Sequence, residues 1–194
     1  MRRAALIALL PLFAAGAAHA ADDAGRYRLC LATAKAAPAR AMAAANGWIV
    51  EGGGAPARHC LGLAYLADSK PAAASTAFEN AAKIAEGSGL PSAPDLWAQA
   101  GNAALMTNDA TRARLMLDNA LRLAPATHPR RADMLIDHAR ANFELDQTSV
   151  TRSDLDAALA LQPDNVPALL LRATLARIDR RLPDAATDIA RAAK

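Results

Sequence analysis

The chain has 194 residues, of which 53% are hydrophobic and only 4% aromatic, and its 22 basic and 19 acidic residues give a net charge of +3. This length suits one domain with a core of its own. Without a basic cluster or a series of aromatic rings, the composition argues against a nucleic-acid surface, which needs cations to neutralise phosphates and rings to stack on bases.

The first twenty residues predict a secretory signal peptide. Arg2 and Arg3 supply a positive start, residues 4–13 form an apolar run, and the Ala-His-Ala sequence at 18–20 has the small residues of a cleavage site. The apolar run is shorter than the roughly 20 residues that a membrane-spanning helix needs. We therefore expect residues 1–20 to be removed and the mature protein to be periplasmic, without a membrane span. An uncleaved N-terminal anchor is the alternative.

Residues 21–54 predict a degenerate opening pair of helices. Apolar residues recur at helical spacing in the first helix, Ala37-Pro38 interrupts the pattern, and it resumes over residues 39–50. The three glycines at 52–54 then predict a flexible joint before the next unit.

The two cysteines, Cys30 and Cys60, both follow the predicted signal peptide. An oxidising compartment would allow them to form a disulfide, which would stabilise the fold by about 3–4 kcal/mol in the chain-entropy model. The alternative is a pair of small buried apolar residues. A redox role is not expected because no C-x-x-C sequence occurs. Together with His59 the cysteines would still lack the fourth ligand of a structural zinc site, so we predict no metal and no cofactor.

From residue 55 onward, one pattern of small and apolar residues occurs four times, in units of about 55–93, 94–131, 132–165 and 166–194. Small residues are needed where two paired helices touch, large residues fill the gaps between successive turns, and a proline stops the second helix. The residues that carry the pattern are Leu61, Gly62, Tyr65, Ala74, Phe78 and Ala81; then Trp97, Ala100, Gly101, Ala104, Ala113, Leu117, Ala120 and Pro125; then Leu135, Ala139, Leu155, Ala158 and Pro163; and finally Leu169, Ala173, Ala176, Ala185, Ile189 and Ala192.

This pattern resembles the tetratricopeptide repeat (TPR) over roughly residues 55–194. The resemblance implies an all-α, right-handed superhelical solenoid of helix-turn-helix units, in an exported member of the family. Longer intervals between units fall at residues 86–94 and 125–129, where they should lengthen connections or helix ends. In the third unit Asn142 and Thr151 replace an aromatic residue and an alanine, so this unit should be the least well packed.

No nucleotide-binding, hydrolase, metalloprotease or haem motif occurs, so we predict no catalytic residue, no enzyme activity and no small-molecule substrate. His138 is expected to be buried or hydrogen-bonded. The resemblance implies a scaffold or adaptor whose concave groove binds a partner protein or peptide in the cell envelope. The alternative is a structural or assembly subunit that acts through self-association or by docking into an envelope complex.

The geometry of the family implies which residues of the first helices line that groove. Family members that grip a C-terminal carboxylate use lysine, asparagine and arginine side chains. This chain has His59, Leu63, Gln99, Asp133 and Asp137 at those positions, so that mode of binding is not expected. An apolar trough is implied instead, with Arg140 and Arg177 available to an acidic group; alternatively the large side chains are ordinary packing residues and the arginines a solvated edge. The implied groove residues are His59, Leu63, Leu66, Ala98, Asn102, Leu105, Met106, Ile136, Arg140, Phe143, Leu170, Thr174 and Arg177.

Overall fold

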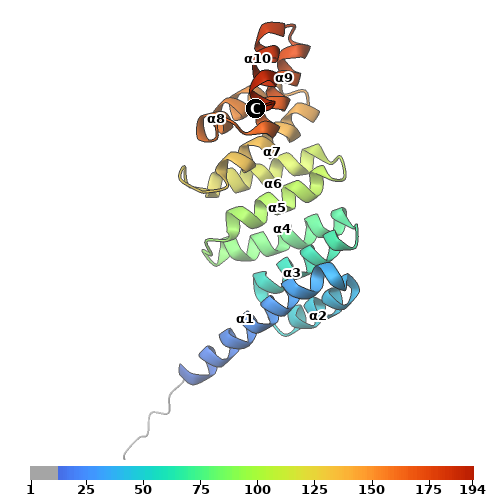
Figure 1. The fold of residues 1–194 in the computed structure, drawn as a ribbon. Helices are drawn as coiled ribbons and strands as arrows, with labels where there is room; N and C mark the ends of the chain where they lie inside the picture. The colour runs from blue at the N-terminus through green and yellow to red at the C-terminus, as the bar shows by residue number, and fades with distance from the viewer. Residues whose placement is uncertain (1–12) are drawn as a thin grey trace, which may run out of the picture.

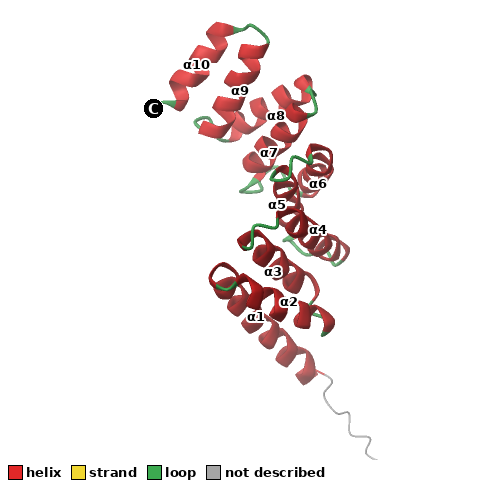
Figure 2. Ribbon diagram, turned by 90° about the vertical axis from the view of Figure 1, so that its right-hand side faces the viewer, coloured by secondary structure: helices red, strands yellow, loops and turns green. Residues whose placement is uncertain are grey.

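The computed structural model describes residues 13–194, and the side chains from residue 22 onward. Within that range it contains ten α-helices and no β-strand (Figures 1 and 2). The helices are α1 (Phe13–Ala36), α2 (Pro38–Val50), α3 (Gly54–Ala67), α4 (Pro71–Gly87), α5 (Ala93–Leu105), α6 (Ala110–Leu123), α7 (Arg131–Glu144), α8 (Thr148–Leu161), α9 (Val166–Ile178) and α10 (Leu182–Ala192).

The helices form consecutive pairs that stack along one axis, from the blue N-terminal end to the red C-terminal end in Figure 1. From α2 onward each helix packs mainly against its neighbours in the sequence, whereas α1 packs against α3 as extensively as against α2. The first helix of a pair also touches the first helix of the next pair at α5–α7 and α7–α9. The predicted all-α, right-handed solenoid is confirmed. Its buried apolar residues form separate clusters that follow one another along the stack, from the first helices to α9 and α10.

The pairs α3–α4 and α5–α6 are each held by a large side chain that fits against a glycine. Phe78 of α4 is completely buried, and a Cβ atom added to Gly62 of α3 would lie only 2.4 Å from its ring. In the next unit, a Cβ on Gly101 would lie 2.7 Å from Cγ of Leu117. Such distances leave no room for a side chain, so glycine is required where the two helices cross.

The turn between α2 and α3 is tightly packed, whereas the sequence predicted a flexible joint. The amide of Gly53 donates a 2.9 Å hydrogen bond to the carbonyl oxygen of Trp48, and a Cβ at Gly53 would lie 2.4 Å from the indole ring. Gly52 and Gly54 have positive φ angles of 93° and 54°. Gly53 thus allows the indole ring to approach closely, and Gly52 and Gly54 adopt backbone angles that glycine favours.

The extra residues between units have two effects. One insertion extends α4, which has 17 residues whereas α3 has 14. The other forms the connection between α6 and α7, over residues 124–130. Both leave the stack continuous, because the inserted residues lie at helix ends.

Asn142 and Thr151, which were expected to weaken the third unit, are both buried without losing hydrogen bonds. The Asn142 amide donates to the carbonyl oxygen of His138 at 2.9 Å, and the Thr151 hydroxyl donates to that of Gln147 at 3.0 Å. Bonds to a carbonyl four residues earlier let a polar side chain be buried within its own helix.

The predicted signal peptide lies partly outside the described residues, because residues 1–12 are not described and α1 begins at Phe13. Its cleavage after Ala20 stays a prediction. Over the described part of the chain, none of the helices combines the length and apolar character required to cross a membrane.

Candidate partner-binding groove

A groove of about 570 Å³ opens between the first helices of the last three units, α5, α7 and α9. It brings together five of the residues predicted to contact a partner, namely Asn102, Ile136, Arg140, Leu170 and Thr174. The remaining lining residues are Arg130, Asp133, Asp137, Asn165, Pro167 and Leu171. We call this the α5–α9 groove.

The two walls of the α5–α9 groove differ in character. The α9 wall is mainly apolar, with Pro167, Leu171 and Leu170, which is 48% exposed. The opposite wall is polar and carries Asp133 and Asp137 on α7 together with Asn102 on α5. A ligand that fits this groove would therefore need both an apolar and a polar side.

Burial raises the pKa of the Asp137 carboxyl group, and the Asn102 amide and the Arg140 guanidinium only partly oppose this rise. Nη1 of Arg140 lies 3.4 Å from Oδ1 of Asp137, and Nη1 of Arg130 lies 3.4 Å from Oδ1 of Asp95. These distances are at the outer limit of a hydrogen bond. The arginines at the groove are therefore weakly paired.

Several ion pairs away from the groove are closer. Nη2 of Arg122 lies 2.6 Å from Glu86, Nη2 of Arg112 lies 2.7 Å from Glu79, and Arg172 holds both carboxylate oxygens of Asp188 at 2.7 and 2.8 Å. Each of these pairs joins two helices, α4 with α6 or α9 with α10. Bidentate and short charged contacts of this kind are structural, whereas the groove charges keep bonding capacity for a ligand.

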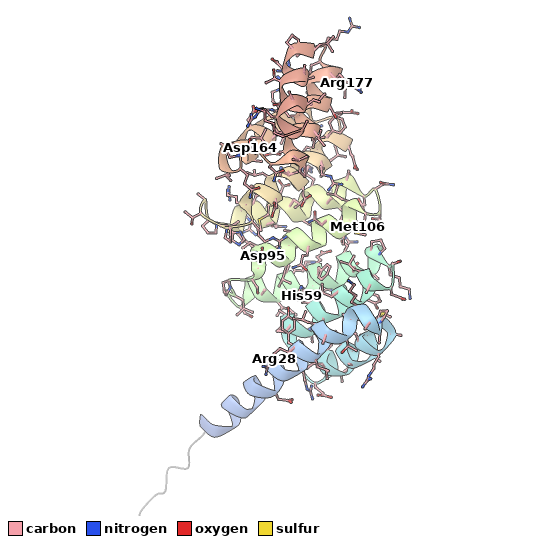
Figure 3. All side chains as sticks on the ribbon, in the orientation of Figure 1. Arg28, His59, Asp95, Met106, Asp164 and Arg177 are labelled. Atoms are coloured by element: carbon pink, nitrogen blue, oxygen red, sulfur yellow. A yellow bond between two sulfur atoms is a disulfide. The ribbon has the colours of Figure 1, made fainter. Side chains whose placement is uncertain are left out.

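His59, labelled in Figure 3, lies in a second cavity of about 350 Å³, which shares Arg130 with the α5–α9 groove. The Tyr27 hydroxyl donates to its Nδ1 at 2.6 Å, and its Nε2–H donates to Oε1 of Gln99 at 2.8 Å. Burial lowers the pKa of His59, which agrees with a neutral ring. His59 therefore links α1, α3 and α5.

The other predicted groove residues are spread over different environments. Leu63 and Leu66 are half-buried against the core, Ala98 and Leu105 are buried, and Phe143 is half-buried. Met106, at 63% exposure, and Arg177 are exposed, and both are labelled in Figure 3. The open part of the predicted surface is thus shorter than expected and is centred on α7 and α9.

Sequence reasoning missed the acidic centre of the groove. Asp133 and Asp137 were noted only as departures from a carboxylate-binding set, although two acids one helical turn apart were a usable signal. Asn165 was also missed. It lies in the loop before α9, where its Oδ1 accepts from the amide of Ala168 at 3.1 Å and caps the helix.

His138 lies on α7, between two carboxylates from the neighbouring helices. Its Nδ1–H donates to Asp154 of α8 at 2.8 Å, and its Nε2–H donates to Asp118 of α6 at 3.0 Å. Although burial lowers the pKa of His138, these two carboxylates outweigh it and raise the pKa. The expectation of a buried, hydrogen-bonded histidine is confirmed.

His138 should make the fold less stable as the pH rises. A folded-state pKa above the ordinary value of about 6.5 means that its stabilisation is complete below pH 6.5 and is lost as the pH rises through the raised pKa. Urea unfolding between pH 5 and pH 9 checks this. The variant His138→Gln should remove this part of the pH dependence.

His59→Gln is the matched control, because the pKa of His59 is lowered and its contribution to stability therefore changes with pH in the opposite direction. Its wild-type contribution is lost as the pH falls below about 6.5. If His138→Gln left the alkaline decrease in stability unchanged, the proposed charge state of His138 would be wrong.

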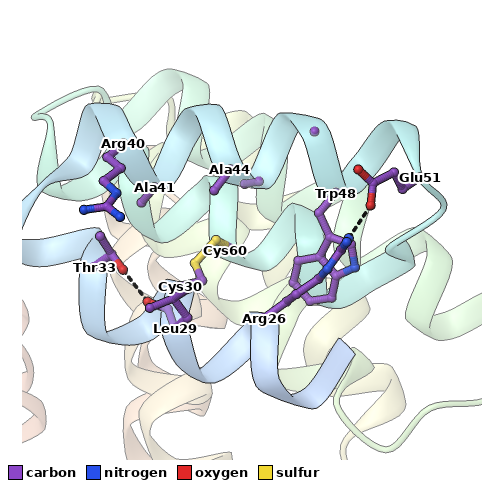
Figure 4. Close-up of a pocket in the computed structure, with 12 residues that line it drawn as sticks. Arg26, Leu29, Cys30, Thr33, Arg40, Ala41, Ala44, Trp48, Glu51 and Cys60 are labelled. Carbon is purple, nitrogen blue, oxygen red and sulfur yellow. Dashed lines mark hydrogen bonds and ion pairs between the residues drawn. A yellow bond between two sulfur atoms is a disulfide. The ribbon is translucent and has the colours of Figure 1, made fainter. Parts of the chain in front are cut away.

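Cys30 of α1 and Cys60 of α3 lie together in the core of the first two units (Figure 4). Both are buried, and their Cα atoms are 5.9 Å apart. This separation is within the range that a disulfide requires.

Among the residues whose side chains are described, no group of three or more His, Cys, Asp or Glu is arranged to hold a metal ion. The α5–α9 groove offers a partner a shaped surface, an apolar wall and charged side chains.

Solved structures with a similar fold are TPR proteins. MamA (residues 41 to the end) from Desulfovibrio magneticus RS-1 shares 17% identity with a TM-score of 0.73, over 88% of this chain and 93% of that one. A putative kinesin light chain of Podosopora anserina with nearly identical TPR-like repeats shares 14%, with a TM-score of 0.69, over 87% and 92%. YrrB, described as a TPR protein with an unusual peptide-binding site, shares 15%, with a TM-score of 0.69, over 86% and 82%.

No family model matches the sequence, and no curated protein matches it. At these identities the likeness concerns the fold, which is that of a TPR solenoid.

Proposed function

We propose that this chain is a non-catalytic interaction scaffold of the periplasm, which holds a segment of a partner protein in the α5–α9 groove. The observation that carries the proposal is the groove itself, a cavity of about 570 Å³ with an apolar wall, a polar wall and loosely paired charges. The fold supports it, since stacked helix pairs create extended binding surfaces along their first helices. Among the similar structures, YrrB is described as having a peptide-binding site.

The periplasmic location rests on the sequence of residues 1–20, with its positive start, apolar run and cleavage site. The adjacent cysteines agree with it, because stable disulfides form mainly in oxidising compartments. We therefore propose that the working form starts at Ala21 and carries a Cys30–Cys60 disulfide.

Blocking the groove should abolish partner capture. Thr174 is exposed and lines the groove, so Thr174→Trp places a large ring where the partner segment would lie. We expect capture by crosslinking in the native envelope to fall at least tenfold, as for disruption of an interface hot spot. Helicity and molecular size should not change.

Ile178→Trp is the matched control, because Ile178 lies on the same helix, is 61% exposed and does not line the groove. It should capture the partner as well as the wild type does. Loss of capture by this control alone would place the interface elsewhere on α9.

A second candidate function is assembly through the C-terminal end of the solenoid. Ile189 of α10 stands at the place in its unit that Phe78, Leu117 and Leu155 occupy in the others. Those three are fully buried, whereas Ile189 is 50% exposed. Light scattering separates the two candidates, because a stable dimer that Ile189→Gln dissociates would favour assembly.

A further inference from the structure

The centre of the α5–α9 groove is rich in hydrogen-bond acceptors. Asp133 forms no ion pair or hydrogen bond with any residue whose side chain is described. Asp137 is half-buried, with Arg140 3.4 Å away as its only ion-pair partner in that part of the chain. Two carboxylates one turn apart on α7 thus face the groove with little compensation.

Asn102 indicates independently that the groove lacks a hydrogen-bond donor. Its Oδ1 atom is buried and accepts no hydrogen bond from the described side chains or backbone. The nearby Asp137 carboxylate fixes the orientation of the amide, because the NH₂ group must face the acid. The oxygen therefore needs a donor, and an unmet buried acceptor is costly.

We infer that the α5–α9 groove selects a partner segment by an arginine or lysine side chain, which binds at Asp133 and Asp137 with its donors toward Asn102. This inference rests on the proposed function, because it names the chemistry of the segment held in the same groove. The inferred charge on the partner is opposite to that of the acidic group that the sequence implied.

The walls of the groove match such a side chain along its length. The aliphatic stem of arginine or lysine would lie on Leu170 and Pro167 of the apolar α9 wall. Its charged head would reach the α7 wall, where an arginine can bind two carboxylate oxygens at once.

An acidic group fits the same place poorly. It could reach Arg140 or Arg130, whose contacts with Asp137 and Asp95 are long at 3.4 Å, but it would then face the uncompensated charge of Asp133 and the Asp137 carboxylate. Like charges at contact distance in a half-buried groove repel, so a carboxylate would be disfavoured.

A library of capped octapeptides, randomised at one position at a time, tests the inference with the full chain as the probe protein. We expect arginine and lysine to be enriched at one position. Replacing that arginine by the neutral isostere citrulline should weaken binding about 10- to 100-fold, the range for hydrogen bonds to charged groups. Affinity should also fall as the pH is lowered through the raised pKa of Asp137.

The variant Asp133→Asn with Asp137→Asn should bind the arginine and citrulline peptides equally. Burial already disfavours the charged form of Asp137, so this variant should fold, which its melting curve verifies. Asp164→Asn is the charge-matched control, since Asp164 is largely exposed in the α8–α9 loop (Figure 3) and should keep the preference.

The outcomes separate this inference from the proposed function. Binding of octapeptides with a neutral or acidic preference, or an arginine preference that survives in the double variant, would leave the groove as a peptide site and contradict cation selection. Failure of the wild type to bind any octapeptide would instead count against the proposed function, and the inference with it.

Discussion

Replacing Phe78 by alanine should destabilise the chain by about 3–5 kcal/mol, the range for removing a buried aromatic ring. Phe78 is completely buried, and its ring lies against Gly62 and 5.5 Å from the His59 ring centroid. The cavity left behind would separate α4 from α3 at their crossing point. Because each unit is stabilised only by its neighbours, the first part of the solenoid should lose the most stability.

Chemical unfolding followed by circular dichroism measures this effect. The control is Met106→Ala, which truncates a side chain that is 63% exposed and should cost less than about 0.5 kcal/mol.

A double-mutant cycle tests whether the contact with Gly62 is responsible. Gly62→Ala should be strongly destabilising in the wild type, since its methyl group would lie 2.4 Å from the Phe78 ring, but should add little to the destabilisation caused by Phe78→Ala. Additive effects of the two changes would show that Gly62 is not constrained by the ring.

Loss of the proposed disulfide should have the second largest effect. Cys30 and Cys60 are 30 residues apart, and closing a loop of this length stabilises a fold by about 3–4 kcal/mol in the chain-entropy model. For a chain of this size that corresponds to a Tm lower by about 10 °C. Changing both cysteines to serine, or adding a reductant, should therefore loosen α1 from α3.

Thiol counting on exported protein, under denaturing and non-reducing conditions, should find no free thiol. The same sample gives an intact mass, which should also lack residues 1–20. The single variants Cys30→Ser and Cys60→Ser should each melt at about the temperature of the double variant. Two free thiols in exported protein would rule out the disulfide.

The helix pairs could be predicted because their signals are local. Small residues such as Gly62 and Gly101 recur at a fixed distance from large ones such as Phe78 and Leu117, so spacing alone identifies the crossing points. The glycine turn at 52–54 could not be predicted in the same way. Whether it is loose or tight depends on the Trp48 ring that packs over it.

The candidate groove was only partly predictable, since openness is a property of the assembled stack. Leu105 and Met106 are neighbours in the sequence, yet the first is buried and the second exposed. His59 points toward Tyr27, a contact that depends on how α1 lies across α3. Exposure of this kind follows from tertiary packing, which periodicity within one helix does not determine.

The half-buried His59 and the buried His138 give the solenoid an uneven response to acidity. Protonation would weaken the joint around His59 at the N-terminal end, whereas loss of a proton would weaken the joint around His138 nearer the C-terminal end. Stability in a repeat protein is approximately a sum over neighbouring units. A change in pH therefore moves stability from one part of the molecule to another, and sets which end opens first.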